Sequence, residues 1–258
     1  MEIEKHSVLV NADRCVGCGL CTKDCVSGAI TLKDGKAAVT GEGCIFCGHC
    51  EAICPNGAVS LTGFQESSEE YEKQTRLDPE ELLKAIKTRR SVRVFADEMI
   101  PDSVTDSIIE AGRLAPTGAN AQNTGFIVLG SKQNDAEKMA LSLFRKLMKA
   151  GKPFIPFLKD MEFDDRFFFK GAPLVIVLTG NIVNASLAAE NMAFMAEAQG
   201  LGVFFSGFFT MCANHSSKIR DLLQMERKEK AVTTLVIGFP GVSYKRTVRR
   251  EPARVRKL

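Results

Sequence analysis

Eight of the nine cysteines lie in two short runs near the N-terminus, and these runs constrain the fold more than any other feature. Both runs have the spacing C-x2-C-x2-C-x3-C, which lets closely spaced thiolates reach one iron–sulfur cluster. In such paired runs the fourth ligand of each cluster comes from the other run. We therefore expect two 4Fe–4S clusters, one held by Cys15, Cys18, Cys21 and Cys54, and the other by Cys44, Cys47, Cys50 and Cys25.

Two other uses of the cysteines fit the sequence less well. A disulfide framework needs an oxidising compartment, and the N-terminal residues have no signal-peptide organisation. Zinc sites use two separated pairs of ligands rather than runs of four. Gly17, Gly19 and Gly48 lie inside the runs, where they let the backbone wrap closely around an inorganic core.

Short apolar stretches flank both cysteine runs, at residues 8–11, 29–32, 36–39 and 58–61. Each half is thus expected to form a strand, a cluster loop, a helical turn and a second strand. Over residues 5–63 this pattern closely resembles the two-cluster bacterial ferredoxins, which implies an electron-transfer domain. Val26 stands where a proline usually follows the fourth cysteine, but this is a backbone preference and leaves the ligands intact.

Length and composition favour a two-domain protein away from membranes. A chain of 258 residues suits two domains, and its 45% hydrophobic content is ordinary for a globular protein. The sequence has no apolar run of the roughly 18–20 residues that cross a bilayer. Free thiolates and the missing signal peptide lead us to expect a reducing, cytoplasmic location and no membrane partner.

Charge is distributed unevenly along the chain. Residues 1–63 carry five basic and seven acidic residues, whereas residues 64–258 carry 29 and 24. The C-terminal segment 244–258 is strongly basic. We expect no nucleic-acid binding, because this segment has neither interleaved aromatic residues nor a known binding motif. Docking or phosphate binding is the favoured role for it.

A polar, acidic linker is expected at residues 64–77, between a ferredoxin domain at 1–63 and a second domain at 78–258. Asp78 followed by Pro79 predicts a helix start. Leu82, Leu83 and Ile86 would form the apolar stripe of that helix.

The second domain is expected to have an α+β fold. Apolar periodicity predicts helices at 102–115, 134–149 and 184–199, and strands at 126–129, 174–178 and 234–237. These elements do not alternate regularly, which argues against a doubly wound sheet. In the helix 102–115 we expect Val104, Ile108, Ala111 and Leu114 to face inward. Cys212 is expected to be a buried small hydrophobe, and His215 to begin a helix.

The second domain lacks the usual nucleotide-binding and hydrolytic motifs. Neither G-x-G-x-x-G after a strand nor G-x-x-x-x-G-K-[ST] occurs, and the three histidines suggest no Ser–His–Asp set. The basic run Arg89-Arg90-Ser91-Val92-Arg93 stands out instead, because three guanidiniums and a hydroxyl can grip a phosphate. Taken alone, this run could equally be a solvated helix end favoured by the helix dipole.

Two further segments change that weighing: the amide-rich loop 115–123, and the turn 237–240 with the basic residues after it. Together with the basic run, they resemble the nitroreductase family over about residues 79–252. The R-R-S-x-R run is similar to the family's FMN signature, and A-P-[ST]-x-x-N-x-Q is similar to its second motif. The resemblance implies FMN bound at the interface of an intertwined homodimer, with the helix 184–199 at the centre of that dimer.

Carried over residue by residue, the resemblance implies FMN contacts from four segments. These contacts are Arg89, Arg90, Ser91 and Arg93 on the phosphate, ribityl chain and ring edge, Asn120 and Gln122 near the ring, Ser206 and Gly207 against the isoalloxazine, and Lys245 and Arg246 on the phosphate. Arg249 competes with the last pair in that register. Asn123-Thr124 stands where Pro and an aromatic residue often follow the Gln, which alters one edge of the pocket.

The segment 152–173 corresponds to a lid over the flavin in the family. It holds Phe154, Phe157, Phe163, Phe167, Phe168 and Phe169. An aromatic substrate could stack on these rings, although each of them could equally belong to the core.

Combined, these features predict an FMN-dependent oxidoreductase that receives electrons through its own clusters. Each cluster carries one electron and a flavin takes one or two, so the pair suits reduction of a small aromatic or unsaturated acceptor. The donor would be reduced ferredoxin or NAD(P)H. We assign no catalytic acid or base. The alternatives are an electron-transfer or redox-sensing module serving a partner protein, and, within the same fold, reductive dehalogenation or flavin breakdown.

Overall fold

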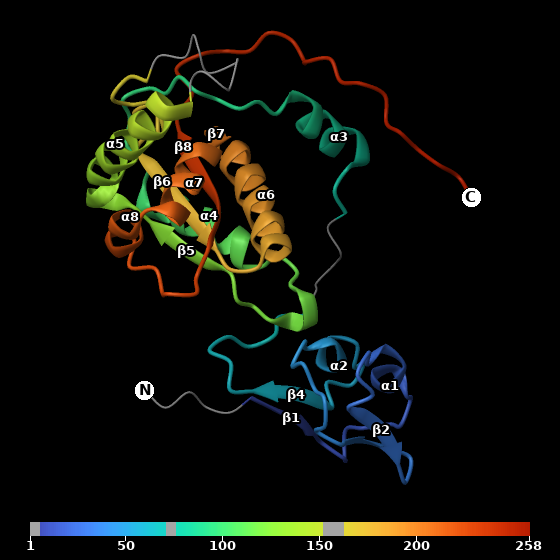
Figure 1. Cartoon of the computed structure of the whole chain (residues 1–258). Coiled ribbons are helices and arrows are strands. Elements are labelled where there is room, and N and C mark those ends of the chain that lie inside the picture. The colour runs from blue at the N-terminus through green and yellow to red at the C-terminus, as the bar shows by residue number, and fades with distance from the viewer. Residues whose placement is uncertain (1–5, 71–75, 152–162) are drawn as a thin grey trace. The chain divides into compact units, whose positions relative to one another are not determined.

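The computed structural model describes residues 6–70, 76–151 and 163–258 (Figure 1). The chain divides into two compact units. The first unit contains residues 1–76 together with 118–121, and the second contains residues 77–117 and 122–258. The turn at residues 118–121 therefore belongs to the first unit, although the chain on both sides of it belongs to the second.

The first unit contains two antiparallel strand pairs, β1 with β4 and β2 with β3. Its elements are β1 (Ser7–Val10), α1 (Leu20–Asp24), β2 (Ile30–Lys33), β3 (Lys36–Val39), α2 (His49–Ala52) and β4 (Val59–Thr62). The expected repeat of strand, loop, helical turn and strand is thus confirmed in both halves. Pairing of the first strand with the last closes the unit around a small core of Ile30, Ala37, Ala58 and Val59 with Cys15 and Cys21.

The second unit is built on a four-stranded sheet in the order β5-β6-β8-β7, and every neighbouring pair in it is antiparallel. Its strands are β5 (Gly125–Val128), β6 (Leu174–Thr179), β7 (Gly202–Phe205) and β8 (Ala231–Gly238). An antiparallel sheet covered by helices is an α+β fold, so the expected fold class is confirmed. The central strand β6 is buried along its whole length, as its uninterrupted apolar sequence predicts.

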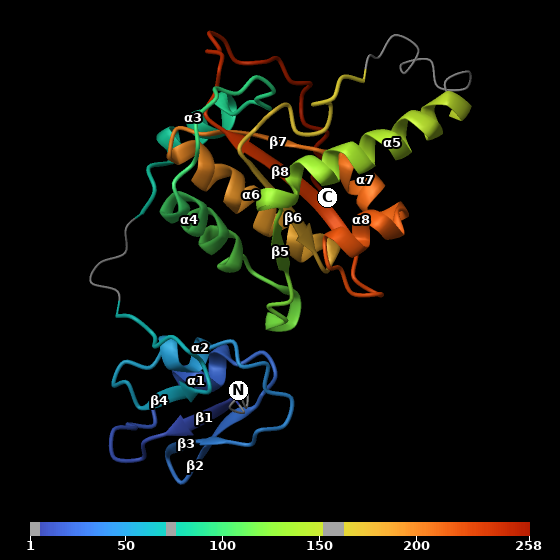
Figure 2. The same cartoon turned by 90° about the vertical axis from the view of Figure 1, so that its left-hand side faces the viewer.

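Helices cover both faces of this sheet (Figure 2). The helices are α3 (Pro79–Thr88), α4 (Asp102–Arg113), α5 (Gln133–Gly151), α6 (Ile182–Ala198), α7 (Gly207–His215) and α8 (Ser217–Leu222), with short 3-10 turns at Gly118–Asn120 and Gly130–Lys132. Alternation along β6 explains the layers, because successive side chains point to opposite faces. Val175 and Val177 pack with α5, α7 and α8, whereas Ile176 and Leu178 pack with α4 and α6.

Most of the predicted elements are present, with instructive exceptions. Asp78 caps α3 by accepting the backbone N–H groups of Glu80 and Glu81, as expected. The expected inward position of Leu114 is wrong, because this side chain follows the end of α4 and is 66% exposed. His215 ends α7 rather than beginning a helix, and Ser216 caps the next helix. The helix expected to begin at His215 begins at Ser217 as α8, whereas the strand β7 and the helix α7 were not expected.

Candidate functional site

The eight cysteines of the first unit surround two small cavities. One cavity, of about 20 Å³, is lined by Cys15, Cys18, Cys21 and Cys54. The other, of about 30 Å³, is lined by Cys25, Cys44, Cys47 and Cys50. The structure thus brings together the same two sets of four, each containing one cysteine from the other run. In the described residues, no three His, Cys, Asp or Glu side chains converge as they would on a single metal ion.

Hydrogen-bond donors point at several of the sulfurs. The backbone N–H of Ala37 lies 3.3 Å from Cys15 Sγ, and that of Ala58 lies 3.2 Å from Cys54 Sγ. The Ala37 N–H lowers the pKa of the Cys15 thiol, because it stabilises the thiolate. Burial instead raises the pKa of Cys50 to about 11. Since iron binds the thiolate, these N–H donors fit the residues to cluster ligation.

The two cysteine loops differ at one equivalent position. Gly17 in the first loop and Phe46 in the second both have left-handed backbones, with φ of 68° and 50°. A side chain at Gly17 would collide with the carbonyl oxygen of Gly35. The second loop has room for the Phe46 ring, whose centroid lies 5.7 Å from that of His6. A bulky residue in this conformation is an outlier, and such strain often marks functional segments.

Asn120 lies against this second cysteine loop. Its Nδ2 donates to the carbonyl oxygens of Ile45 and Phe46 at 3.1 and 3.0 Å. Ala119, Asn120 and Gln122 all have left-handed backbones, so the turn that carries the amide is itself strained. The structure therefore places Asn120 beside a cluster loop, and its expected contact with a flavin ring stays a prediction.

A basic cavity of about 510 Å³ opens beside the end of α3 in the second unit. It is lined by Arg89, Arg90, Ser91, Arg93, Tyr244, Arg246, Thr247, Val248 and Arg250. Four residues of the basic run thus come together with Arg246, as the sequence predicts. Lys245 is not among the lining residues, and its Nζ instead lies 3.3 Å from Ser243 Oγ. Arg249, which the sequence offered as a competitor of Lys245 and Arg246, is not among the lining residues either, whereas Arg250, which the sequence did not single out, is.

One guanidinium nitrogen beside the basic cavity has no hydrogen-bond partner among the described residues. This nitrogen, Arg89 Nη1, is buried, while Arg89 Nε lies 3.9 Å from Glu190 Oε1. Burial raises the pKa of nearby Glu197, and the charge of Arg89 opposes this rise. An unpartnered, buried guanidinium nitrogen is costly, so the site suits an anionic ligand that would satisfy it.

Backbone hydrogen bonds fix the basic run against the sheet. The Val92 N–H donates to Val203 O of β7 at 3.1 Å, and the Gly241 N–H donates to Val94 O at 2.8 Å. We call residues 91–94 the strap. Where the strap crosses β7, the strand must carry a glycine, because a Cβ at Gly202 would lie 2.5 Å from Val92 Cγ2. These contacts hold Ser91 and Arg93 at the edge of the sheet.

An aromatic cavity of about 650 Å³ lies next to the basic one. Its lining residues are Arg93, Phe167, Phe168, Lys170, Phe204, Phe205, Ser206, Gly207, Phe208 and Met211. Arg93 lines both cavities, so a basic compartment and an aromatic compartment meet at this one side chain. Ser206 and Gly207, which the sequence singled out, begin α7 and lie in the aromatic compartment.

The expected aromatic lid is partly core. Phe168 and Phe169 are buried among Phe144 and Phe209, whereas Phe167 is half-buried and lines the aromatic cavity. Phe154 and Phe157 lie outside the described residues. Cys212 is buried in the same core, as expected, and burial raises the pKa of its thiol to about 11.

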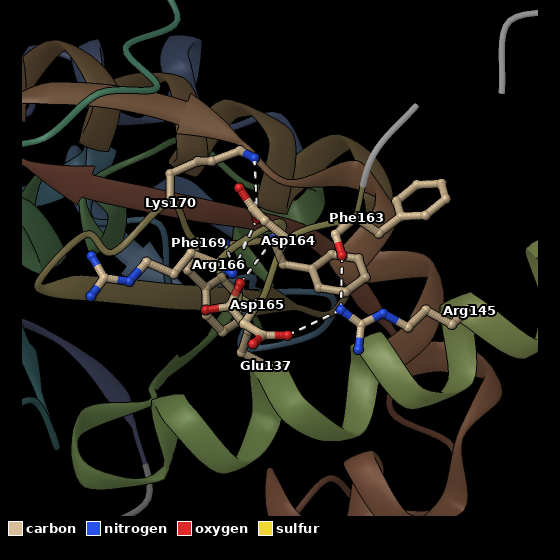
Figure 3. A network of polar contacts seen from close by, with 9 residues as sticks. Glu137, Arg145, Phe163, Asp164, Asp165, Arg166, Phe169 and Lys170 are labelled. Carbon is tan, nitrogen blue, oxygen red and sulfur yellow. Dashed lines mark hydrogen bonds and ion pairs between the residues drawn. The ribbon is translucent and has the colours of Figure 1, made fainter. Parts of the chain in front are cut away.

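A buried carboxylate holds the segment that carries these rings (Figure 3). Glu137 Oε1 accepts the backbone N–H groups of Phe168 and Phe169 at 2.8 and 3.0 Å. Desolvation by burial raises the pKa of Glu137. On the same segment, Arg145 Nη2 donates to Phe163 O at 2.8 Å and lies 3.0 Å from Asp165 Oδ1. The wall of the aromatic cavity is thus anchored from behind by α5.

Each of the two units contains a segment that matches a known protein family. Residues 86–239 match the Nitroreductase family, and residues 14–59 match the 4Fe-4S dicluster domain. The chain belongs to the nitroreductase family. This nitroreductase-family chain therefore combines an oxidoreductase fold with an N-terminal dicluster domain.

Individual relatives are distant. An FMN reductase (NADPH) of Bacillus subtilis is 22% identical over 166 residues, covering 62% of this chain and 66% of that protein. An iodotyrosine deiodinase of Hydra vulgaris is 24% identical over 195 residues, covering 65% of this chain and 70% of that protein. A solved nitroreductase with bound FMN from Bacteroides fragilis shares the fold with a TM-score of 0.57 at 19% identity, covering 69% of this chain and 99% of that one.

In the part of the chain that the structure describes, none of the helices combines the length and apolar character needed to cross a membrane.

Proposed function

We propose that this nitroreductase-family protein is an FMN-dependent oxidoreductase that receives electrons through two 4Fe–4S clusters and reduces a small aromatic or unsaturated acceptor. The observation that carries this proposal is the meeting of a basic and an aromatic cavity at Arg93. An FMN molecule has the matching halves, a dianionic phosphate and a planar ring system. The two cysteine cavities of the first unit supply the electron-carrying part.

The residues of the basic cavity fit the phosphate of FMN. Arg89, Arg90, Arg246 and Arg250 would hold it, and Arg89 Nη1 has a donor that no hydrogen bond among the described residues uses. Ser206 and Gly207 would lie against the ring among the phenylalanines. Ring contacts by Asn120 and Gln122, and a phosphate contact by Lys245, are part of the proposal on family resemblance alone. When bound, FMN supplies one- and two-electron redox chemistry.

The cysteines fit two clusters in the crossed arrangement. Cys15, Cys18, Cys21 and Cys54 would hold one, and Cys44, Cys47, Cys50 and Cys25 the other, because these sets line the two cavities. The N–H groups of Ala37 and Ala58 would donate to ligand sulfurs. Such cysteine-ligated clusters fit a reducing, cytoplasmic setting, with reduced ferredoxin or NAD(P)H as the proposed donor.

A homodimer is part of the proposal. The helices α3 and α6 expose apolar side chains that a partner subunit would cover: Leu82, Leu83, Ile86, Ile182, Val183 and Leu187. Exposed apolar groups on neighbouring turns commonly mark interfaces. Light scattering after size-exclusion chromatography should give about twice the chain mass of 28.2 kDa; a monomer at micromolar concentration would contradict a dimer.

Anaerobic reconstitution tests the cofactor assignment. The purified chain should bind about eight iron atoms and about one FMN, as expected for two four-iron clusters and one flavin site. Arg89→Met should lower the flavin content and leave iron unchanged, and Arg249→Met is the matched control because its side chain lies outside the cavity lining. A folded, iron-loaded chain that binds no FMN would refute the proposal.

A carrier role is the second candidate, favoured by the exposed basic residues of 249–257. Such a surface suits docking to an acidic partner protein. Rapid, saturable oxidation of the reduced protein by a small nitroarene supports the enzyme, whereas oxidation only in the presence of a partner supports the carrier. The deiodinase among the relatives makes a halogenated aromatic a necessary member of the acceptor panel.

A further inference from the structure

The aromatic cavity has an unusual charge balance. Its described lining contains five phenylalanines and one methionine, and both of its charged residues, Arg93 and Lys170, are cations. Arg93 also lines the basic cavity, so the proposed cofactor site already uses it. Lys170 lies on the segment between α5 and β6, far in sequence from Arg93. It is therefore the cation available to a second molecule in this cavity.

The backbone and its neighbours hold Lys170 in place. Lys170 adopts a left-handed conformation with φ of 53°, and Gly171 after it has φ of 74°. The Nζ atom lies 5.0 Å from the centre of the Phe167 ring, a cation–π arrangement with a ring that lines the same cavity. Strained backbone at non-glycine residues is concentrated at functional sites.

Among the described residues, Lys170 has one acidic side chain within ion-pair distance, Asp164, and the charge of Lys170 also acts on Glu137. Asp164 Oδ1 lies 3.9 Å from Nζ, and the Asp164 side chain is 67% exposed against 28% for Lys170 (Figure 3). An ion pair at this distance and exposure contributes little, so the ammonium keeps donors for another anion. Glu137 fixes the neighbouring Phe168 and Phe169 N–H groups from behind, which limits how far the Lys170 backbone can move.

We propose that Lys170 determines substrate specificity, by selecting acceptors that carry an anionic group on a planar apolar body. The rings of Phe167, Phe205 and Phe208 would bury that body, and Lys170 would bind its carboxylate or phenolate. This inference rests on the proposed function, because it names the acceptor class of the same cavity. It adds that neutral aromatics of equal size are poorer ligands.

A matched pair of probes tests the charge. Binding of para-nitrobenzoate and para-nitrobenzamide to the oxidised, cofactor-loaded protein is measured by calorimetry without any electron donor, and their KM values are measured separately. The wild-type protein should bind the anion about tenfold more tightly, in the range of one charge-assisted hydrogen bond. Lys170→Met should abolish this preference and leave amide binding within about twofold, because only the charge is removed.

Two further variants separate charge from structure. Lys170→Arg keeps the positive charge and should retain most of the preference for the anion. Lys138→Met removes an exposed lysine from α5 and should leave both affinities unchanged. If Lys170→Met, folded and flavin-loaded, still prefers the anion, or if the wild type binds both probes equally, the inference is wrong. If the protein holds no flavin, the proposed function fails instead, so the two failures are distinguishable.

Discussion

The two units of this protein support their sites in opposite ways. The buried apolar core of the first unit is small, and two of its six residues are the cysteines Cys15 and Cys21. The second unit packs two large clusters, with 18 and 16 buried residues among those described, on the two faces of its sheet. The basic and aromatic cavities of the second unit lie beside this core, and most of their lining residues are not part of it. The first unit should therefore need its cofactors in order to fold, and the second should not.

Removing a cluster ligand should have the largest effect, and this effect should be confined to the first unit. Cys54→Ala should cost the first unit one cluster and most of its stability, because the ligand ties together two distant parts of the chain. Hydrogen exchange should then become fast across residues 6–62, while β6 and α6 stay protected. Cys212→Ala, which removes a buried thiol from the second unit, should keep the full iron content. Fast exchange in both units of the Cys54 variant would show that they do not fold independently.

Removing a cation from the basic cavity should have the complementary effect. Arg93→Met should weaken FMN binding by roughly tenfold to a hundredfold, because a hydrogen bond to a charged group contributes about 1.5–3 kcal/mol. The melting temperature of the flavin-free second unit should hardly change, since Arg93 is exposed and outside both core clusters. Fluorescence titration with FMN and calorimetry of the flavin-free protein measure the two quantities. A variant that binds FMN normally would remove Arg93 from the site.

The same contrast explains what could be predicted from sequence. Three cysteines of each set follow from local spacing and the fourth from the exchange between the two runs, and the structure gathers these sets around two cavities. The basic run was also visible, since Arg89 to Arg93 are adjacent in sequence. Lys170 and Arg250 were not, because they reach the cavities only when segments about 80 and 160 residues from the run fold against it.

Local signals also failed where packing decides the structure. The strand β7 begins at Gly202, although in sequence this glycine is typical of the end of the preceding helix. The structure needs a glycine at this position because the Val92 side chain packs directly against it. The helix α7 has few polar residues to mark its faces, because one face is buried against α5 and β8 while Phe208 and Met211 on the other line the aromatic cavity. Leu114 was expected inside because it continues the apolar spacing of α4, yet the helix ends before it.

A comparison within the first unit sharpens the role of its backbone. Gly17→Ala should disrupt the first cysteine loop, because the new Cβ meets Gly35 O and the left-handed conformation costs about 1–3 kcal/mol. Phe46→Gly should leave the second cluster intact, because glycine adopts that conformation without strain. Electron paramagnetic resonance of the reduced protein should show one cluster signal lost in the first variant and both kept in the second. Loss of a cluster signal in both variants would contradict the expected difference between the two loops.

The smallest expected effect concerns the buried carboxylate behind the aromatic cavity. Burial raises the pKa of Glu137 in the folded state above its usual value of 4.5. Between these two pKa values the folded chain binds more protons than the unfolded chain, so the second unit loses stability as pH rises. Glu137→Gln stays neutral and keeps an acceptor for the Phe168 and Phe169 N–H groups, so it should lack this loss.

Urea unfolding of α5 and β6, followed by hydrogen exchange at several pH values from about 5 to 8, measures the difference. The stability of the wild type relative to Glu137→Gln should fall by at most about 1.4 kcal/mol per pH unit and then level off above the raised pKa. Asp164 and Lys170 also face this carboxylate, with opposite effects on its pKa, so Lys170→Met should widen the sloping range. A pH-independent difference would show that Glu137 is ionised throughout, with the two N–H donors outweighing its burial.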